Sequence, residues 1–407
     1  MTLAKGTPFV VFGDDWGRRV SSLQHLFRRI IPRYPVVWVN SFGHRAPRVT
    51  VYDLKRAAGK LRAMLRGPAT PRGQGSFSEL PAAVIEPKAL PWHNVPFVHA
   101  LNTRSLLRDI RRALERVAPP PSAPPVLVTG TPAAVGVVGS LGEQVSIYFC
   151  MDNYAELPGV SRTAIEPLER SLLGRIGAVV ATAAELRKSK SPASARAFHL
   201  PQGVNFDHFA TPQPVPPDLA RLGTPRIGFA GGVSECCDLA LIQAVAATNP
   251  RASVVLVGPV SVDLSVLTSP NIHVLGERPY ATLPAYVQAF DVGIIPYVLN
   301  QWTRAVDPLK LLEYLAAGIP VVSTPIPEVH KYAAVIRLAS GPTEFAHAAV
   351  AAYVGDRLEL RQTRQHVARE QTWEHRAAQF LDIVSELCTN GAPASHGSGG
   401  GKSVLLQ

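Results

Sequence analysis

The stretch DPLKLLEYLAAGIPVV, residues 307–322, places a lysine and a glutamate three residues apart in a segment that is otherwise suited to burial. Asp307 is a suitable N-cap, Pro308 suits the first helical position, and Gly318 ends the helical pattern. We therefore expect a helix of about ten residues here, followed by a strand at VVST. A short helix that feeds a strand is the repeating unit of parallel α/β sheets.

Lys310 and Glu313 carry the chemistry of this expected helix. Lys310 lies in the first turn, where backbone N–H groups already favour an anion, and its ammonium adds a full positive charge. Glu313 lies one turn further on the same face, where its carboxylate can accept hydrogen bonds from two vicinal hydroxyls such as those of a ribose. Together they predict a nucleoside diphosphate site. The alternative is an i, i+3 salt bridge on a surface helix, which contributes a few tenths of a kcal/mol.

Short apolar runs alternate with helical patterns along nearly all of the 407 residues, which is typical of βαβ units. We predict an α/β fold of two Rossmann-like, doubly wound domains that face a central cleft. The boundary falls near residue 205, in a linker rich in proline and glycine. Ligands of such sheets bind beyond the carboxyl ends of the strands. The predicted strands are Phe9–Phe12, Val36–Val39, Val126–Thr129, Val145–Cys150, Ala178–Ala181, Arg226–Ala230, Val254–Val257, Ile272–Leu275, Val292–Pro296 and Val321–Ser323.

The composition excludes several classes of protein. At 46% hydrophobic and 17% charged residues the chain can form real cores, so disorder is not expected. Four cysteines without paired spacing predict neither a disulfide framework nor a zinc site, which favours a reducing cytosol. No run reaches the roughly 18 apolar residues of a membrane span, so we expect a protein that is soluble or peripheral to a membrane.

Positive charge is concentrated in the first half of the chain. Lys and Arg number 27 against 13 Asp and Glu up to residue 200, but 14 against 17 after it. The first half therefore favours an anionic partner. Basic amphipathic patterns at 53–67 and 104–117 suit an anionic bilayer, although packed helices with a solvated basic face would look the same. Basic and aromatic residues are not interleaved as in nucleic-acid-binding proteins, so we expect no nucleic acid partner.

Several segments together resemble the GT-B glycosyltransferases of group 1. These are IGFAGGVSECCDLALI (227–242), YATLPAYVQAFDVGIIPY (280–297) and PLKLLEYLAAGIPVVSTPIPEV (308–329), with PQGVNFDHF (201–209) resembling the interdomain turn. TWEHRAAQFLDIVSEL (372–387) is similar to the family's closing helix. The resemblance implies an acceptor-binding domain at 1–204, completed by the returning helix 376–388, and a nucleotide-sugar-binding domain at 205–375. We expect 389–407 to be a flexible tail or tag remnant.

The resemblance also implies a donor site. Lys310 matches the lysine that contacts the diphosphate, and Glu313 matches the ribose-binding carboxylate. Gly231 and Gly232 match the glycine turn that brings backbone N–H groups near the diphosphate or sugar, although a simple tight turn is an equal alternative. Arg278 and Tyr280 match the loop that cradles the base. We also predict that Arg304 helps Lys310 to neutralise the leaving diphosphate.

The sequence departs from the retaining members of this family at two places. Ala305 stands where many retaining members carry a second glutamate, and SECCD stands where they commonly carry Arg or Lys. An inverting enzyme instead needs a general base for the acceptor hydroxyl. Asp152 ends the apolar strand of VSIYFCMDNYAEL and resembles the strand-end aspartate of inverting polysaccharide glycosyltransferases such as the xanthan glucuronosyltransferase. We predict Asp152 as the catalytic base, with a helix cap or Asx-turn as the alternative.

FGDDWG, residues 12–17, follows the first strand, so Asp14, Asp15 and Trp16 are candidates for holding the acceptor. The alternatives are an aspartate that caps the next helix and a buried tryptophan. GDD is not a metal-binding motif in a GT-B enzyme, which uses basic residues and helix dipoles on the diphosphate. We expect no metal and no other cofactor.

We therefore predict an inverting hexosyl- or glycuronosyltransferase, with a UDP-sugar favoured as donor and a lipid-linked or saccharide acceptor. The predicted setting is bacterial exopolysaccharide or cell-surface glycan synthesis, with the enzyme cytoplasmic and peripheral at the inner membrane. A retaining transferase, a nucleotide-sugar epimerase and a non-enzymatic basic binding module are the alternatives.

Overall fold

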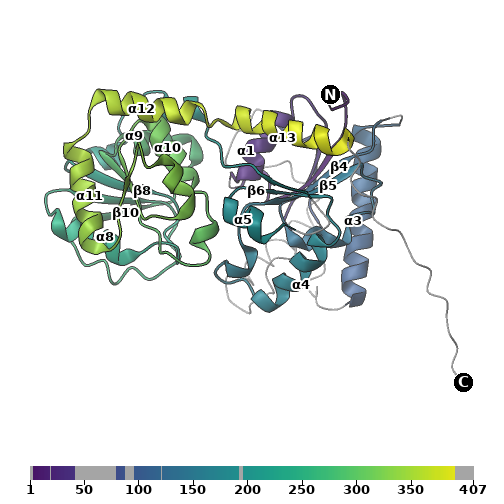
Figure 1. Cartoon of the computed structure of the whole chain (residues 1–407), viewed down its shortest axis with the longest axis horizontal. Helices are drawn as coiled ribbons and strands as arrows, with labels where there is room; N and C mark the ends of the chain where they lie inside the picture. Colours follow the sequence, from purple (N-terminus) through teal and green to yellow (C-terminus); the bar gives the residue numbers. More distant parts are fainter. Residues whose placement is uncertain are drawn as a thin grey trace, which may run out of the picture.

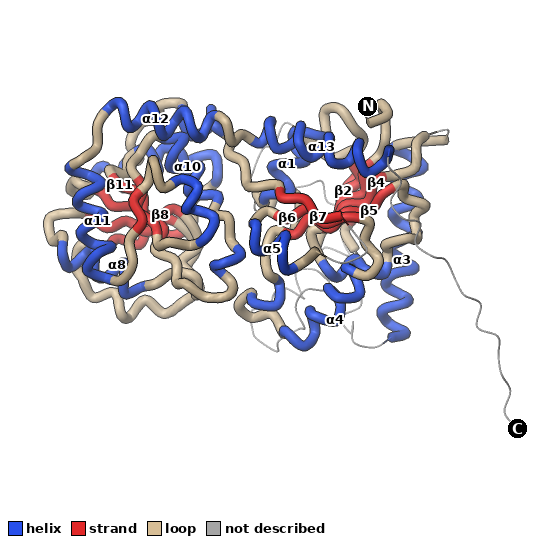
Figure 2. Tube along the Cα trace, viewed as in Figure 1, coloured by secondary structure: helices blue, strands red, loops and turns tan. Residues whose placement is uncertain are grey.

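The computed structural model describes residues 3–18, 20–41, 79–87, 96–120, 122–191 and 196–389, which form two lobes (Figure 1). Each lobe is a parallel sheet with helices on both faces (Figure 2). The two-sheet α/β fold predicted from the sequence is therefore confirmed. The basic pattern at 53–67 and the tail from residue 390 lie outside the described residues. No helix in the described ranges is long and apolar enough to cross a membrane.

The first lobe contains a seven-stranded sheet in the order β3-β2-β1-β4-β5-β6-β7, in which every recorded pairing is parallel. Near-continuous apolar runs form its central strands, as sheets covered on both faces require. Its elements are β1 (Phe9–Phe12), α1 (Ser22–Ile30), β2 (Val36–Val39), β3 (Ala83–Ile85), α3 (Pro96–Val117), β4 (Val126–Thr129), η1 (Pro132–Gly136), β5 (Val145–Cys150), η2 (Tyr154–Glu156), α4 (Arg162–Leu173), β6 (Ala178–Ala181), α5 (Ala184–Ser189) and β7 (Arg196–His199).

Side chains alternate between the two faces of this sheet. Phe9 and Val11 join the core beneath α1, whereas Val10 and Phe12 join the core beneath α3. The last helix of the chain, α13 (Trp373–Thr389), crosses from the second lobe and packs beside α1 (Figure 1). Its Phe380 meets Phe27 of α1 edge-on, with ring centroids 5.9 Å apart. The returning helix thus completes the first lobe.

The second lobe contains a six-stranded parallel sheet in the order β10-β9-β8-β11-β12-β13. Figure 2 shows its strands enclosed by helices. Its elements are α6 (Phe206–Ala210), α7 (Pro217–Ala220), β8 (Arg226–Ala230), α8 (Leu239–Thr248), β9 (Ser253–Val257), β10 (Ile272–Gly276), η3 (Tyr280–Thr282), α9 (Leu283–Gln288), β11 (Val292–Ile295), η4 (Thr303–Ala305), α10 (Leu309–Ala317), β12 (Val321–Ser323), η5 (Pro327–Tyr332), β13 (Arg337–Leu338), α11 (Pro342–Val354) and α12 (Leu358–Arg369).

The start of α10 differs from the prediction. The N-cap is Pro308, and the Asp307 carboxylate instead accepts a hydrogen bond from the Gln202 backbone N–H at 2.9 Å. Asp307 therefore ties the interdomain linker to the second lobe. The predicted end is correct: Gly318 adopts φ 78°, a left-handed conformation that glycine accepts without the cost of a Cβ.

Two further contacts hold the lobes together. Glu328 accepts the backbone N–H of Ala184 at 2.6 Å and so caps α5, whose own N-cap residue offers no side-chain hydrogen bond. Ala305 of η4 is buried in the core of the first lobe, among residues beneath α3. These contacts set the carboxyl edges of the two sheets against each other.

Candidate active site

The second lobe presents Lys310 at the carboxyl edge of its sheet. Lys310 is the second residue of α10, and its ammonium donates a hydrogen bond to the Tyr297 hydroxyl. The ammonium also lies over the rings of Phe229 and Tyr297, at 5.2 and 4.9 Å from their centroids. Burial alone would lower the pKa of Lys310, but Tyr297, Tyr314 and Cys236 outweigh it and the pKa is raised. The side chain therefore stays cationic.

Tyr314 fixes α10 against the end of β8. Its buried hydroxyl accepts the backbone N–H of Ala230 at 2.7 Å, one residue before the glycine turn. A Cβ atom at Gly231 would lie 2.7 Å from Lys310 Cε, so a side chain there would require the end of the lysine to shift from this position. The Gly231 N–H itself is already donated to the Val257 carbonyl. Gly231 thus contributes to the site through the absence of a side chain beside Lys310. Its N–H is already hydrogen-bonded to Val257 and is not available to a ligand.

Gly232 differs from its neighbour. The nearest atoms to a Cβ there belong to Pro259, at 3.9 Å. In the described part of the chain no hydrogen bond is recorded for its N–H. Gly232 rather than Gly231 is therefore the glycine whose N–H could meet a ligand.

Glu313 lies one turn after Lys310 and is half-buried. Burial raises its pKa to about 7, and the charge of Lys310 opposes part of that rise. The Glu313 charge also helps to raise the pKa of Tyr280, after burial, so the two side chains are neighbours. Tyr280 in turn stacks on His208 with centroids 4.7 Å apart and meets the edge of His25 at 5.3 Å. Tyr280 is thus held where the two lobes meet.

The two arginines predicted at the donor site lie in different surroundings. Arg278 pairs with Asp218 at 2.9 Å and donates to the Tyr286 hydroxyl at 2.9 Å, so its guanidinium anchors α7. Arg304, in η4, is exposed. Of the two, Arg304 has the more exposed guanidinium, and it lies near the cleft.

The first lobe presents Asp152 directly after β5. Its loop is well anchored, because Thr182 donates to the Met151 carbonyl at 3.2 Å and Lys190 donates to the Asn153 side chain at 3.2 Å. The Tyr154 hydroxyl donates to the Gly130 carbonyl on the neighbouring strand end. Asp152 is therefore held at the carboxyl edge of the sheet, and it caps no helix: the residue before η2 is Asn153.

Groups from both lobes shift the pKa of the Asp152 carboxyl. Burial raises its pKa to about 7, the nearby indole N–H of Trp302 lowers it, and the charges of Asp14 and Cys236 raise it. Trp302 Nε1 makes no hydrogen bond of ordinary geometry within the described residues, although its N–H lies near enough to Asp152 to lower that pKa. Trp302 and Cys236 belong to the second lobe, and Cys236 also acts on Lys310. The cleft thus brings Asp152 and Lys310 to one region.

The three candidate residues of the FGDDWG segment lie in different surroundings in the structure. Asp14 is exposed to the cleft, although enough protein surrounds it that burial raises its pKa, and the Ser21 hydroxyl opposes that rise. Asp15 accepts from Ser41 Oγ at 2.7 Å. Trp16 is buried and packs edge-on against Trp38, with centroids 4.7 Å apart, so its ring faces the core. Asp14 alone of the three combines exposure with proximity to Asp152. Neither aspartate caps α1, whose N-cap is Ser21.

Metal ligation is the remaining question at this site. No group of three or more His, Cys, Asp or Glu is placed to hold a metal ion in the described ranges. Metal independence stays a prediction.

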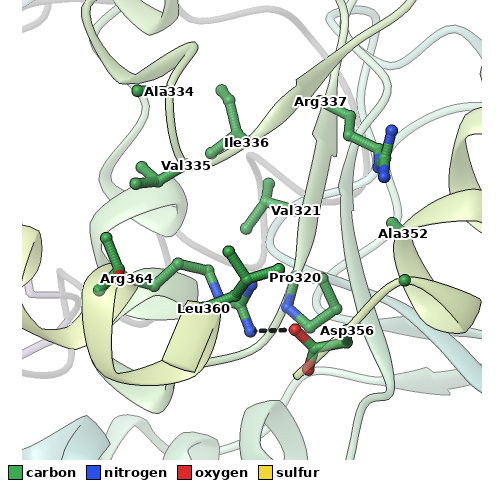
Figure 3. Close-up of a pocket in the computed structure, with 12 residues that line it drawn as sticks. Pro320, Val321, Ala334, Val335, Ile336, Arg337, Ala352, Asp356, Leu360 and Arg364 are labelled. Carbon is green, nitrogen blue, oxygen red and sulfur yellow. Dashed lines mark hydrogen bonds and ion pairs between the residues drawn. The ribbon is translucent and has the colours of Figure 1, made fainter. Parts of the chain in front are cut away.

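A pocket elsewhere in the second lobe is remote from these residues (Figure 3). It lies at the amino ends of β12 and β13, beside the start of α12. Its polar lining includes Arg337 and an ion pair of 2.6 Å between Arg364 and Asp356, and Arg364 also donates to the Gly318 carbonyl. The pocket is separate from the cleft, because it lies at the amino ends of these strands and the cleft lies at their carboxyl ends.

Comparison with known proteins agrees with this geometry. Residues 224–353, which contain Gly231 and Lys310, match the family of group 1 glycosyl transferases. This stretch contains all six strands of the second sheet. A curated Bacillus subtilis protein that bears the name teichuronic acid biosynthesis glycosyltransferase TuaH is 29% identical over 252 residues. That similarity covers 56% of this chain and 63% of the relative, so the chain spans less than two thirds of the relative's length.

Solved structures extend the similarity to both lobes. Anabaena HepE, crystallised with UDP and glucose, aligns with 93% of this chain and 99% of its own at a TM-score of 0.61 and 14% identity. A trehalose 6-phosphate synthase from Burkholderia multivorans aligns with 94% and 99% at a TM-score of 0.62 and 13% identity. At such identities the likeness shows the fold, which is GT-B. The resemblance inferred from the sequence is confirmed.

Four residues at the cleft were not anticipated from the sequence: Cys236, Tyr297, Trp302 and Tyr154. Tyr297 and Tyr154 could have been found, because each follows the carboxyl end of a strand by a few residues. Cys236 lies in the SECCD segment, where the sequence shows only the absence of a basic residue. Trp302 carries no local signal, since its role depends on the approach of the other lobe.

Proposed function

We propose that the chain is a glycosyltransferase that takes a sugar from a nucleotide sugar, with a UDP-sugar favoured, and transfers it with inversion. The acceptor is a lipid-linked or other saccharide of bacterial cell-surface or exopolysaccharide synthesis. The group 1 domain and the TuaH similarity support the class, and UDP in the HepE structure supports the donor. The observation that carries the mechanism is Asp152, an anchored carboxyl at the cleft with a pKa of about 7.

In the proposed reaction Asp152 removes the proton of the acceptor hydroxyl, and the oxygen attacks the anomeric carbon of the donor. The bond from that carbon to the diphosphate oxygen breaks, and the diphosphate leaves with both electrons. Lys310 stabilises the negative charge that develops there. A cation that is already in place before the reaction stabilises such a charge most effectively. Glu313 holds the ribose through its two hydroxyls, and Arg304 adds charge near the leaving group.

Inversion is favoured over retention by the surroundings of Ala305. Its side chain is buried against the first lobe, in an apolar core. A glutamate at this position would have to enter that core rather than face the donor, which costs several kcal/mol for an unpaired charge. The carboxylate at the cleft is instead Asp152, on the opposite wall.

The test is transfer from a panel of nucleotide sugars to saccharide and lipid-linked acceptors, with the anomeric configuration of the product read by NMR. We expect inversion, and an Asp152→Asn variant that binds donor normally but turns over about 10²–10⁴-fold more slowly. Asp263→Asn, on an exposed turn of the second lobe, is the matched control. A retained anomeric configuration, or full activity of Asp152→Asn, would refute the mechanism. Donor turnover without any acceptor would favour an epimerase.

We also propose that the first lobe docks on an anionic membrane surface, at the cytoplasmic face of the inner membrane. The exposed side of α3 supports this, because it presents five arginines: Arg104, Arg108, Arg111, Arg112 and Arg116. Each such residue near an anionic surface contributes about 1 kcal/mol. Binding to phosphatidylglycerol vesicles that weakens in salt and on charge removal from α3, with no binding to phosphatidylcholine vesicles, is the expected result. Equal binding to both would contradict it.

A further inference from the structure

The pocket of Figure 3 is a hollow of about 250 Å³ at the amino ends of β12 and β13, on the edge of the sheet opposite the cleft. Small residues in its wall leave this space: Ala334 before β13, Ala352 in the last turn of α11, and Gly355 directly after that helix. Ala334 and Leu360 in the lining are exposed, so the hollow opens to solvent. The second lobe therefore offers a preformed space that a small molecule can enter.

Much of the lining of this hollow is apolar. Val321 and Ile336 are buried, Val335 is half-buried, and Leu360 adds an aliphatic side chain from α12. At about 30 Å³ for each water, the hollow has the volume of about eight waters, but water finds few hydrogen-bond partners on such a surface. An apolar group of that volume removes the surface from water instead. The space thus suits a molecule of about eight heavy atoms, which is much smaller than a phospholipid or a nucleotide sugar.

Two arginines and one aspartate supply the charges of the lining, and Figure 3 shows Arg337 apart from the Arg364–Asp356 pair. Arg364 is only 3% exposed, and it donates through Nε and Nη2 to the Gly318 carbonyl and through Nη2 to Asp356, whose charge it neutralises. Within the described ranges no hydrogen bond is recorded for Arg364 Nη1, and no hydrogen bond or ion pair for Arg337. Arg337 Nη2 lies 3.4 Å from the place of a Cβ at Gly355, beside the hollow. The lining therefore has one positive charge in excess.

We propose that this hollow binds a small amphipathic carboxylate, whose apolar body lies on Val321 and Ile336 and whose carboxylate pairs with Arg337. The planar fork of an arginine matches a carboxylate through two parallel hydrogen bonds. Arg364 Nη1 is a further donor in the same wall. A carboxylate balances the single excess charge, whereas a phosphate monoester carries about 1.5–2 negative charges. Because the hollow and the cleft lie at opposite edges of the sheet, this inference does not rest on the proposed function.

The test titrates the full-length protein, with isotope-labelled Ile, Leu and Val methyl groups, with hexanoate and follows the methyl signals by NMR. Hexanoate combines a carboxylate with a five-carbon body. We expect the signals of Val321, Val335, Ile336 and Leu360 to shift and to saturate with a Kd on the order of 1 mM, which is typical for so small a ligand. Acetate lacks the apolar body and hexan-1-ol lacks the charge, so each should bind at least about tenfold more weakly.

Variants identify the residues that bind hexanoate. Arg337→Met keeps an aliphatic stem but removes the charge, so it should weaken hexanoate binding about 10–150-fold. Arg251→Met, which changes another exposed arginine of the second lobe, is the matched control and should bind as the wild type does. Ala334→Phe should fill the hollow from its exposed rim and abolish binding, and an unchanged melting temperature of the free variant checks that it folds. Arg364 is left in place because it holds the Gly318 carbonyl at the end of α10.

Three results would overturn the inference. Equal affinity of Arg337→Met and the wild type, or binding of hexan-1-ol as tight as that of hexanoate, would exclude the pairing with Arg337. Methyl shifts confined to residues outside the hollow, or no saturable shift at all, would exclude the site. Lys310→Ala should bind hexanoate as the wild type does, and a loss of binding there would place the anion in the cleft instead.

Discussion

Gly231 and Lys310 are in such close contact that a Cβ on the glycine would lie 2.7 Å from the lysine Cε and 3.1 Å from its Nζ. The turn after β8 and the first turn of α10 therefore form one unit. In this position against Tyr297 the end of the lysine occupies space that a side chain at residue 231 would fill.

Gly231→Ala should displace the Lys310 ammonium and weaken nucleotide-sugar binding. A hydrogen bond to a charged group contributes about 1.5–3 kcal/mol, so we expect a loss of about 10–150-fold in affinity by calorimetry. Gly223→Ala, on the exposed segment before β8, is the matched control, because a Cβ there meets nothing closer than 3.9 Å. An equal loss in both variants would mean that the contact with Lys310 is not the cause.

The proposed transferase activity should fall as the pH drops through the pKa of Asp152, about 7, because only the carboxylate can accept a proton. Two neighbours of Asp152 should shift the acidic limb of the pH profile of kcat/KM in opposite directions. Asp14→Asn removes a charge that raises the pKa, so the limb should move to lower pH. Trp302→Phe removes an N–H that lowers the pKa, so the limb should move to higher pH. Shifts in the same direction would contradict the arrangement.

Donor affinity has a pH dependence of its own, through Glu313. Its pKa of about 7 means that the carboxylate, the form that accepts hydrogen bonds from a ribose, is lost as the pH falls below 7. Affinity for an intact nucleotide sugar should therefore decline by up to about tenfold per pH unit below that point. In Glu313→Gln the decline should vanish and the affinity should be low throughout. A wild-type affinity that is flat across this range would refute the ribose assignment.

Glu328 should contribute to stability by capping α5 across the lobes. Glu328→Ala removes the acceptor of the Ala184 N–H, and loss of a helix cap lowers the free energy of unfolding by about 0.5–2 kcal/mol. Glu328→Gln keeps an acceptor oxygen and should retain most of this. Chemical denaturation with hydrogen exchange at α5 measures both. Faster exchange in Glu328→Gln than in Glu328→Ala would exclude the cap as the cause.

The central strands of both sheets were predictable from the sequence, whereas three edge strands were not. β3, β7 and β13 each pair with a single neighbour and include partly exposed residues, so they lack the continuous apolar run that identifies a buried strand. The proposed site shows the same division. Lys310, Glu313 and Asp152 follow from local patterns at strand and helix ends.

The remaining parts of the site arise only when the lobes meet. Asp307 looked like a helix cap because the sequence cannot show that Gln202, 105 residues away, lies beside it. Trp302 and Cys236 reach Asp152 across the cleft, and no spacing within either lobe predicts that approach. Trp16 had two interpretations, and the core provided by Trp38 decides between them.

The most direct test of the account is the thermal stability of the wild-type protein and of Lys310→Ala in the presence of UDP-, GDP-, dTDP- and ADP-sugars. A donor at about 100 times its dissociation constant should stabilise the wild type by about 2.7 kcal/mol. We expect this for a UDP-sugar, and at the same concentration little or none for Lys310→Ala. If no nucleotide sugar stabilises the wild type, or if Lys310→Ala responds as the wild type does, the donor site is not the one described.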